Sequence, residues 1–321
     1  MSVGLRVVFD GNNTAYRANC VTELYTKSGE RTSALIGTLN IIHSSMENLI
    51  KKYDLPIKEV IFAWDKGHAK RRTQLFPEYK GNRNHEKTEE EKQWMSEFIT
   101  QANILYEKLP LFGVKCLRHD GWEADDLIYG CIHQLRQKHP DDIAVVVSTD
   151  EDFHQLISGG VDLYSPVKGV LYSLDNYQEL MGIPQELFLT YKILKGDSSD
   201  NISGIPGIGE KTAKTLVNEY GNLGQILSQT NREALMKSKR TARIFSPEGL
   251  SILSRNNQLI NLKDYVDLTE VSQEINDFLE DLPFVDTRAA KEFLMRYQLT
   301  SVLVKWNFWI QSFEEITSNF D

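Results

Sequence analysis

The first half of the chain alternates between short apolar runs and longer amphipathic segments. The apolar runs are rich in β-branched residues, as in buried parallel strands, and lie at residues 3–9, 58–64, 113–118 and 142–148. Apolar side chains recur at helical spacing at residues 33–53, 98–112, 123–139 and, more briefly, 151–157. Two further short strands are expected at residues 161–165 and 169–173. Strands that alternate with helices in this way predict an α/β domain, with a central, mostly parallel sheet that has helices on both faces.

The strand pattern fades after about residue 183. Residues 184–195 and 210–220, with several later segments, show only helical spacing of their apolar side chains. We therefore expect two domains, an α/β domain at residues 1–180 and a helical domain at residues 181–321. Within the first domain, the acidic segment at residues 84–97 is expected to be mobile.

Acidic residues are concentrated where the predicted strands end. The strand ends and the two segments GWEADD and GDSSDN supply nine acids: Asp10, Asp65, Glu123, Asp125, Asp126, Asp150, Asp152, Asp197 and Asp200. A single aspartate at such a position is usually a turn or cap residue. Because the carboxyl ends of parallel strands meet at one edge of a sheet, we expect the whole set to converge there.

Nine carboxylates in one crevice would repel one another strongly unless cations neutralise them. Oxygen ligands without cysteine or histidine favour hard divalent ions, so the expected cofactor is Mg²⁺, with Mn²⁺ as a substitute. Two such ions about 4 Å apart suit the hydrolysis of a phosphodiester, since one activates water and the other stabilises the leaving oxygen. The number of these acids also equals the net negative charge of the chain, which is −9.

The overall composition narrows the class of protein further. Hydrophobic residues make up 41% and charged residues 25% of the 321 residues, as in soluble globular proteins. No apolar run approaches the ~20 residues of a membrane span, and the start MSVGLRVVFD predicts no signal peptide. The three cysteines have neither close spacing nor histidine partners, which argues against a zinc site and favours a reducing compartment. We expect a cytoplasmic protein with no membrane contact.

A basic segment follows the second predicted strand. Residues 66–87 carry seven lysine and arginine residues, among them Arg72, Lys80 and Arg83, around the aromatic Tyr79. This composition favours contact with phosphates and stacking on a base, and a solvated charged surface is the alternative.

The string NISGIPGIGEKTAKTL predicts a helix–hairpin–helix. Gly204, Gly207 and Gly209 allow a tight turn, and their amides can bind a phosphate together with the N-terminus of the next helix. Lys211 and Lys214 can reinforce this contact, and the hairpin carbonyls could hold K⁺. The string also resembles a P-loop, but its lysine is displaced by one residue and no strand precedes it.

Six strings occur in one order along residues 9–213: FDGNNTAYRA, FAWD, FPEYKGNR, WEADD, STDEDF and GDSSDNISGIPGIGEKTA. Together they resemble the flap endonuclease/5′-3′ exonuclease family, particularly stand-alone phage 5′-nucleases and the nuclease domain of bacterial DNA polymerase I. The resemblance implies a PIN-like sheet and a helical arch at residues 66–110 over the active site. It also implies that the hairpin is the family's H3TH motif, which grips duplex DNA.

The resemblance further implies roles for individual residues. One metal ion would lie among Asp10, Asp65, Glu123 and Asp125, and the second near Asp150, Asp152 and Asp200, with Asp126 and Asp197 in support. Lys80 would stabilise the transition-state phosphate, and Tyr79 would stack on the substrate near the cut. The remaining DNA contacts would come from Arg72, Arg83, Gly204, Gly207, Gly209, Lys211 and Lys214.

The expected function is a metal-dependent 5′-3′ exonuclease and flap endonuclease that removes RNA primers or 5′ flaps during DNA replication. RNase H-type activity on RNA–DNA hybrids would accompany it. Its substrates would be DNA with a 5′ flap, a nick or an RNA primer, and its partners a polymerase or a single-strand-binding protein. If a phage encodes the chain, the location would be the host cytoplasm.

Three alternatives remain open. A PIN-type metal-dependent ribonuclease would also gather acids at strand ends, but it would lack the hairpin. A non-catalytic DNA-binding clamp would not need the complete set of acids. A nucleotide-hydrolysing protein would use the incomplete P-loop and would hydrolyse ATP.

Overall fold

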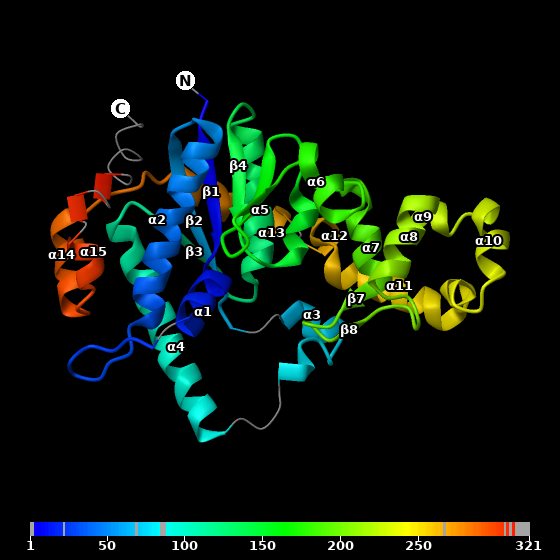
Figure 1. Cartoon of the computed structure of the whole chain (residues 1–321), viewed down its shortest axis with the longest axis horizontal. Helices are drawn as coiled ribbons and strands as arrows, with labels where there is room; N and C mark the ends of the chain where they lie inside the picture. Colours follow the sequence, from blue (N-terminus) through cyan, green and yellow to red (C-terminus); the bar gives the residue numbers. More distant parts are fainter. Residues whose placement is uncertain are drawn as a thin grey trace.

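The computed structural model describes residues 3–21, 23–67, 70–83, 88–265, 268–304, 306–307 and 310–311. A six-stranded sheet in the order β3-β2-β1-β4-β5-β6 forms the centre of the first part of the chain (Figure 1). The strands are β1 (Leu5–Asp10), β2 (Ile57–Trp64), β3 (Lys115–Arg118), β4 (Ile143–Val147), β5 (Val161–Ser165) and β6 (Val170–Tyr172). The first five are parallel and β6 is antiparallel, which confirms the predicted mostly parallel sheet.

The register of the central strands divides their side chains between two cores. Val8 of β1 lies beside Ile61 of β2 and Val146 of β4, and all three belong to the core on one face. The neighbouring row, which includes Val7 and Val145, belongs to the core on the other face. Continuous apolar strands are therefore required here, because both faces of the sheet are covered.

Helices cover both of these faces. On one face, α1 (Gly11–Val21), α2 (Ser33–Tyr53) and α4 (Glu89–Lys108) pack against one another. On the other, α5 (Ala124–Lys138) packs against the strands and α13 (Leu268–Glu280) packs against α5. The remaining short helices of this part are α3 (Lys70–Leu75), α6 (Leu174–Met181), η1 (Gly81–Arg83), η2 (Leu109–Leu111), η3 (Glu151–Leu156) and η4 (Gln185–Leu187).

One predicted helix begins much earlier than expected. The helix predicted at residues 98–112 is α4, which begins at Glu89, so residues 89–97 are helical where a mobile segment was expected. Thr88 accepts a hydrogen bond from the N–H of Glu91 (3.2 Å), and the Glu91 carboxylate accepts one from the N–H of Thr88 (2.8 Å). This reciprocal cap sets the helix start despite the acidic composition. Residues 84–87 lie outside the described residues.

The second part is helical, as predicted, and contains one short hairpin. Its elements are α7 (Phe188–Lys195), β7 (Gly196–Asp197), β8 (Ile202–Ser203), α8 (Glu210–Tyr220), α9 (Leu223–Ile226), α10 (Gln229–Met236), η5 (Thr241–Phe245), α11 (Pro247–Ile260) and α12 (Leu262–Tyr265). Within the described part of the chain, every helix is too short or too polar to cross a membrane.

The last helices return to the α/β domain. In Figure 1, α14 (Thr287–Arg296) and α15 (Thr300–Val304) lie on the opposite side of the molecule from α8–α10. Phe293 and Trp306 are buried against Phe112, with ring centroids 6.2 Å and 6.5 Å away. These two helices therefore bury apolar side chains in the core on one face of the sheet, as amphipathic helices do where a partner face is available. The predicted boundary near residue 180 itself stays a prediction.

Candidate active site

The carboxyl edge of the sheet brings distant acids together. Asp10 is the last residue of β1, and Asp65 directly follows β2. β4, which pairs with β1 on its other side, is followed by the turn that carries Asp150. β2 therefore lies on one side of β1 and β4 on the other. Where the strand order of a parallel sheet reverses in this way, a crevice forms at the carboxyl ends of the strands.

A series of hydrogen bonds joins the acids that follow β1 and β4. Asp10 is 5% exposed, and its carboxylate accepts hydrogen bonds from the N–H of Asn13 (3.0 Å) and the hydroxyl of Ser148 (3.0 Å). The Ser148 hydroxyl oxygen accepts one from the N–H of Asp150 (3.0 Å), and the Asp150 carboxylate accepts one from the N–H of Asp152 (2.9 Å). These contacts fix three of the predicted metal-binding acids relative to one another.

A second set of contacts ties β2 to the start of α5. The carboxylate of Asp65 accepts a hydrogen bond from the N–H of Ala124 (2.7 Å), the first residue of α5. The N–H of Asp65 donates to the side-chain oxygen of Asn12 at the start of α1 (3.0 Å). Glu123 and Asp125, on either side of Ala124, are thereby held beside the strand ends.

Burial and neighbouring carboxylates raise the pKa of three acids at the centre. Burial, followed by the neighbouring Asp65, raises the pKa of Asp10 to about 6. Burial, followed by Asp152 and then Asp10, raises the pKa of Asp150 to about 7. Burial and then Asp150 and Asp10 raise the pKa of Asp125 well above its usual range. Among the described residues none of these three makes an ion pair, so the cluster is electrostatically suited to receive added positive charge.

Five of the acids around this centre pair with a lysine or arginine: Glu123, Asp126, Asp152, Asp197 and Asp200. The ammonium of Lys80 lies 2.6 Å from Glu123, and the guanidinium of Arg83 lies 2.8 Å from Asp200. Burial opposes the charge of Lys80, but Glu123 and then Asp200 outweigh it and raise the pKa of Lys80. Lys80 therefore stays protonated beside the acidic centre.

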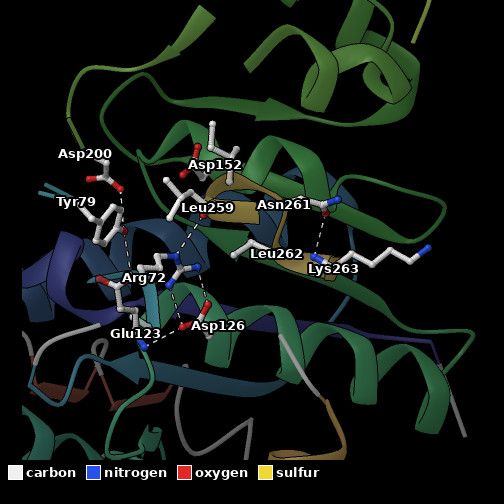
Figure 2. Close-up of polar contacts among 12 residues, drawn as sticks. Arg72, Tyr79, Glu123, Asp126, Asp152, Asp200, Leu259, Asn261, Leu262 and Lys263 are labelled. Atoms are coloured by element: carbon white, nitrogen blue, oxygen red, sulfur yellow. Dashed lines mark hydrogen bonds and ion pairs between the residues drawn. The ribbon is translucent and has the colours of Figure 1, made fainter. Parts of the chain in front are cut away.

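Arg72 is buried inside the protein, which corrects its predicted role as a DNA contact. It is 2% exposed, and its guanidinium lies 2.6 Å from Glu123 and 2.7 Å from Asp126 (Figure 2). Its Nε also donates to the carbonyl of Leu259 in α11 (3.3 Å). The basic run suggested a surface residue, but two carboxylates at the start of α5 compensate the charge and allow burial. Arg72 thus joins the α3 segment, α5 and α11.

Tyr79 is also interior and does not present its ring for stacking. It is 5% exposed, and its hydroxyl lies 3.1 Å from Glu123 and 3.0 Å from Asp200 (Figure 2). Its ring packs with Ile202 and Leu259 of the helical part. The predicted stacking on substrate is therefore wrong for this conformation.

The two acids predicted in supporting positions differ in their contacts. Both carboxylate oxygens of Asp126 are occupied, because Arg72 and the N–H of Glu123 (3.0 Å) donate to them. The carboxylate of Asp197 lies 2.5 Å from the ammonium of Lys192. Burial opposes this charge, but Lys192 outweighs it and lowers the pKa of Asp197 to about 2.

Lys192 is a functional candidate that the sequence did not indicate. It is 1% exposed on α7, and its ammonium lies 2.8 Å from Asp152 as well as 2.5 Å from Asp197. It therefore links an acid of the α/β domain to an acid of the helical part. No sequence signal could have found it, because a lysine on an amphipathic helix is normally solvated.

The three predicted hairpin glycines have different surroundings. A Cβ at Gly204 would lie 2.1 Å from the carbonyl oxygen of Lys195, so this glycine is needed for packing against α7. Gly207 has a φ of +86°, which favours glycine, and Gly209 is an exposed residue with open space where a Cβ would be. Gly207 and Gly209 are exposed, whereas Gly204 is only partly exposed.

Basic residues beside the hairpin enlarge the exposed positive surface. Arg243 donates to the carbonyl of Pro206 in the hairpin (3.0 Å), and Arg240 lies against Thr212 of α8 (3.5 Å). Lys237 and Lys239 are exposed in the same run. The string KSKRTAR was the sequence signal for this surface, and the predicted site residues did not include it. Of the predicted lysines, Lys214 forms an ion pair with Glu210 (3.0 Å) and Lys211 is exposed.

The donor chemistry of the central cluster fits a hard divalent cation. The candidate ligands are carboxylate oxygens, several of them buried and close enough to raise one another's pKa. Among the described residues, however, no three acidic, histidine or cysteine side chains are arranged around one point as ligands of a single ion. The cluster is thus a set of converging ligands, and some side chains must turn to coordinate an ion together.

Two family models together match most of the chain. One, described as the N-terminal resolvase-like domain of 5′-3′ exonuclease, matches residues 6–182, and the other, the C-terminal SAM fold of 5′-3′ exonuclease, matches residues 183–282. A 5′-3′ exonuclease of Buchnera aphidicola (subspecies Acyrthosiphon pisum) is 30% identical over 262 residues, which cover 81% of this chain and 84% of the relative. The chain belongs to the 5′-3′ exonuclease family. It is a structure-specific 5′ nuclease, as predicted.

Other members of the 5′-3′ exonuclease family are larger or have solved structures. DNA polymerase I of Caldicellulosiruptor bescii is 30% identical over 256 residues, but the chain spans only 28% of its length. The structure of bacteriophage T5 5′-exonuclease with divalent zinc ions matches with a TM-score of 0.68 and 26% identity, over 86% of this chain and all of that one. A T5 flap endonuclease structure that contains DNA and metal ions matches equally well, with a TM-score of 0.68. The predicted fold class is confirmed.

The charge of the central cluster leads to a prediction about stability. Without divalent ions, replacement of Asp150 by Asn should raise the melting temperature at pH 7.5 by a few degrees. The pKa of Asp150 is raised to about 7 in the folded protein against 3.8 in the unfolded chain. The folded state therefore retains a proton that the unfolded state loses, and wild-type stability should fall as the pH rises from about 4 to 7.

The measurement is thermal unfolding in EDTA at several pH values. The exposed Asp141→Asn variant is the control and should follow the wild-type curve. A melting temperature of Asp150→Asn that is equal to or below the wild-type value at pH 7.5 would show that Asp150 carries no repulsive charge.

Proposed function

We propose that this nuclease hydrolyses phosphodiester bonds in DNA near the junction of a 5′ single strand and a duplex. The observation that carries the proposal is the meeting of acids from β1, β2, β4 and α5 at one sheet edge, with Lys80 beside them. The T5 structures with divalent metal ions and with DNA support both the cofactor and the substrate class.

Divalent metal ions are the cofactor, and we propose Mg²⁺ as the ion used. Asp10, Asp65, Asp125 and Asp150 would hold it, with Asp152 and Asp200 nearby, because these carboxylates lie around the electrostatically uncompensated centre. A bound divalent ion supplies an activated water and stabilises charge on the leaving oxygen.

The lysine next to the cluster would act on the scissile phosphate. Lys80 is protonated, and the same contacts that raise its pKa keep its ammonium at the edge of the acidic centre. An ammonium there can donate a hydrogen bond to a phosphate oxygen as negative charge develops in the transition state. Arg83 is more exposed than Lys80 and could hold a neighbouring phosphate.

The duplex would be bound by the hairpin and the basic residues beside it. Gly207 and Gly209 are exposed, and α8 begins directly after Gly209, so its first N–H groups can meet a backbone phosphate. Lys211 and the run from Lys237 to Arg243 add positive charge on the same side. Such contacts bind DNA by its backbone and give no base specificity.

Several finer points of the prediction stay proposals. They are the activity on RNA–DNA hybrids, the removal of primers during replication, association with a polymerase or single-strand-binding protein, K⁺ at the hairpin and a cytoplasmic location. The alternative of a ribonuclease for free RNA is disfavoured, because the family model for the C-terminal 5′-3′ exonuclease domain includes the hairpin.

The proposed function is tested by cleavage of end-labelled substrates. Flapped, nicked, gapped and RNA–DNA duplexes should be cut near the junction with Mg²⁺ and left intact with EDTA. The inactive control is Asp10→Asn, which should bind the flap but not cut it. Cleavage of free single-stranded RNA in preference to flapped DNA would overturn the proposal.

The role of Lys80 leads to a separate prediction. Replacement by Ala should lower kcat about 100- to 1,000-fold and change KM little, because the hydrogen bond that it removes forms mainly in the transition state. Steady-state cleavage of a flap substrate at varied substrate concentration gives both values. A rise in KM with unchanged kcat would mean that Lys80 only holds the ground-state substrate.

The basic run beside the hairpin predicts the salt dependence of binding. The double variant Lys237→Gln/Lys239→Gln should weaken duplex binding and flatten its salt dependence, by about 0.9 in the log–log slope for each phosphate that is no longer neutralised. A matched control is Lys51→Gln/Lys52→Gln in the last turn of α2, at the edge of the sheet where β2 begins. Equal slopes for both double variants would exclude the run from the DNA interface.

A further inference from the structure

Two segments of different domains are joined beside the active site by reciprocal backbone contacts. The side-chain amide of Asn201 donates to the carbonyl of Glu78 (2.7 Å), and the amide of Asn82 donates to the carbonyl of Ser198 (2.9 Å). Between them, the backbone N–H of Lys80 donates to the carbonyl of Asp200 (2.9 Å). In Figure 1, the segment that follows α3 lies next to β7 and β8, in agreement with these contacts. We call residues 78–83 and 198–201 with these contacts the asparagine clasp.

The clasp fixes an unusual backbone conformation at Lys80. Its φ is +55°, in the left-handed region that residues with a side chain other than Asn or Asp rarely adopt. Such a conformation persists only where the surrounding contacts hold it. It allows two successive side chains to reach one carboxylate, since the Tyr79 hydroxyl and the Lys80 ammonium lie 3.1 Å and 2.6 Å from Glu123.

Asn201 is suited to its position in the clasp by its own backbone. Its φ is +60°, and asparagine tolerates this region better than other residues apart from glycine. Its side-chain amide is directed to the carbonyl of Glu78 and so to the backbone of the facing segment. Asn201 is half-buried and Asn82 is exposed, so neither belongs to a hydrophobic core.

We propose that Asn201, together with Asn82, is a positioning residue that sets the location of the Lys80 ammonium. The inference rests on the proposed role of Lys80 in cleavage. The clasp holds the α3–η1 segment to the turn that carries Asp197 and Asp200, and this turn continues through β8 into the hairpin. The lysine is thus placed by the helical part of the chain, whereas the central acids come from the sheet.

The test uses Asn201→Gly, which keeps the positive φ but removes the amide. It should lower kcat about tenfold and leave the affinity for a flap substrate, measured in EDTA, within about twofold. Asn82→Ala removes the hydrogen bond to the carbonyl of Ser198 at a residue whose φ is not positive. This variant should also lower kcat. The control is Asn176→Ala, which removes an amide-to-carbonyl hydrogen bond to Leu171 (2.8 Å) near β6 and should leave kcat unchanged.

A double-mutant cycle separates positioning from a merely structural role. In the Lys80→Ala background, Asn201→Gly should cause less than about a twofold further decrease in kcat, because the group that it places is already gone. A full tenfold decrease in both backgrounds, or an unchanged kcat in the single variants, would overturn the proposal. Failure of the proposed function is distinguishable, since the wild type would then not cut flaps or Lys80→Ala would retain full activity.

Discussion

Repulsion between buried carboxylates is the constraint on which the rest of the site depends. Asp10, Asp125 and Asp150 each experience the charge of a neighbouring carboxylate, and burial strengthens the effect. A fold that gathers such groups must supply cations around them or keep some of them protonated. The arrangement of lysine and arginine side chains in this nuclease follows from that requirement.

The surrounding cations come from elements that the sheet alone does not bring together. Arg72 and Lys80 reach Glu123 from the segment after β2, and Lys192 reaches Asp152 from α7. Each pair ties a separate element to the acidic edge. A buried pair of this kind contributes little net stability when both partners are present, but removal of one partner is costly. The pairs therefore act mainly by holding α3, α5 and α7 in one arrangement around the centre.

The acids were predictable from the sequence, and the buried cations were not. An aspartate after a β-branched run identifies a strand end, and the parallel topology then places all such ends at one edge. A run such as KRR gives no sign of which member turns inward, so the pattern favours DNA contact for Arg72 although Glu123 and Asp126 enclose it. The prediction that Tyr79 contacts DNA fails for the same reason, since its hydroxyl reaches two acids from distant parts of the sequence.

Local sequence patterns differ in how well they predict the ends of helices and the roles of glycines. The helix at residues 33–53 is predictable with its observed ends, because its apolar stripe is long and regular. The start of α4 is not, because the Thr88–Glu91 cap lies in a segment whose acidic residues dominate the pattern. Gly204 resembles Gly207 and Gly209 in the sequence, although its small size serves the close contact with Lys195. Such packing depends on contacts between residues that are distant in the sequence. The spacing of residues along the sequence does not reveal those contacts.

The active site is therefore shared between the two parts of the chain. One hydrophobic core runs without interruption from Val146 of the sheet through Ile193 of α7 to Ala213 of α8. Side chains on such a continuous core cannot move far independently, because interiors are close-packed. In the proposed function, a duplex bound at the hairpin would therefore lie in a fixed position relative to the acids at the sheet edge. Under that proposal, the distance between the hairpin and the acids, rather than any contact with a base, would determine where the strand is cut.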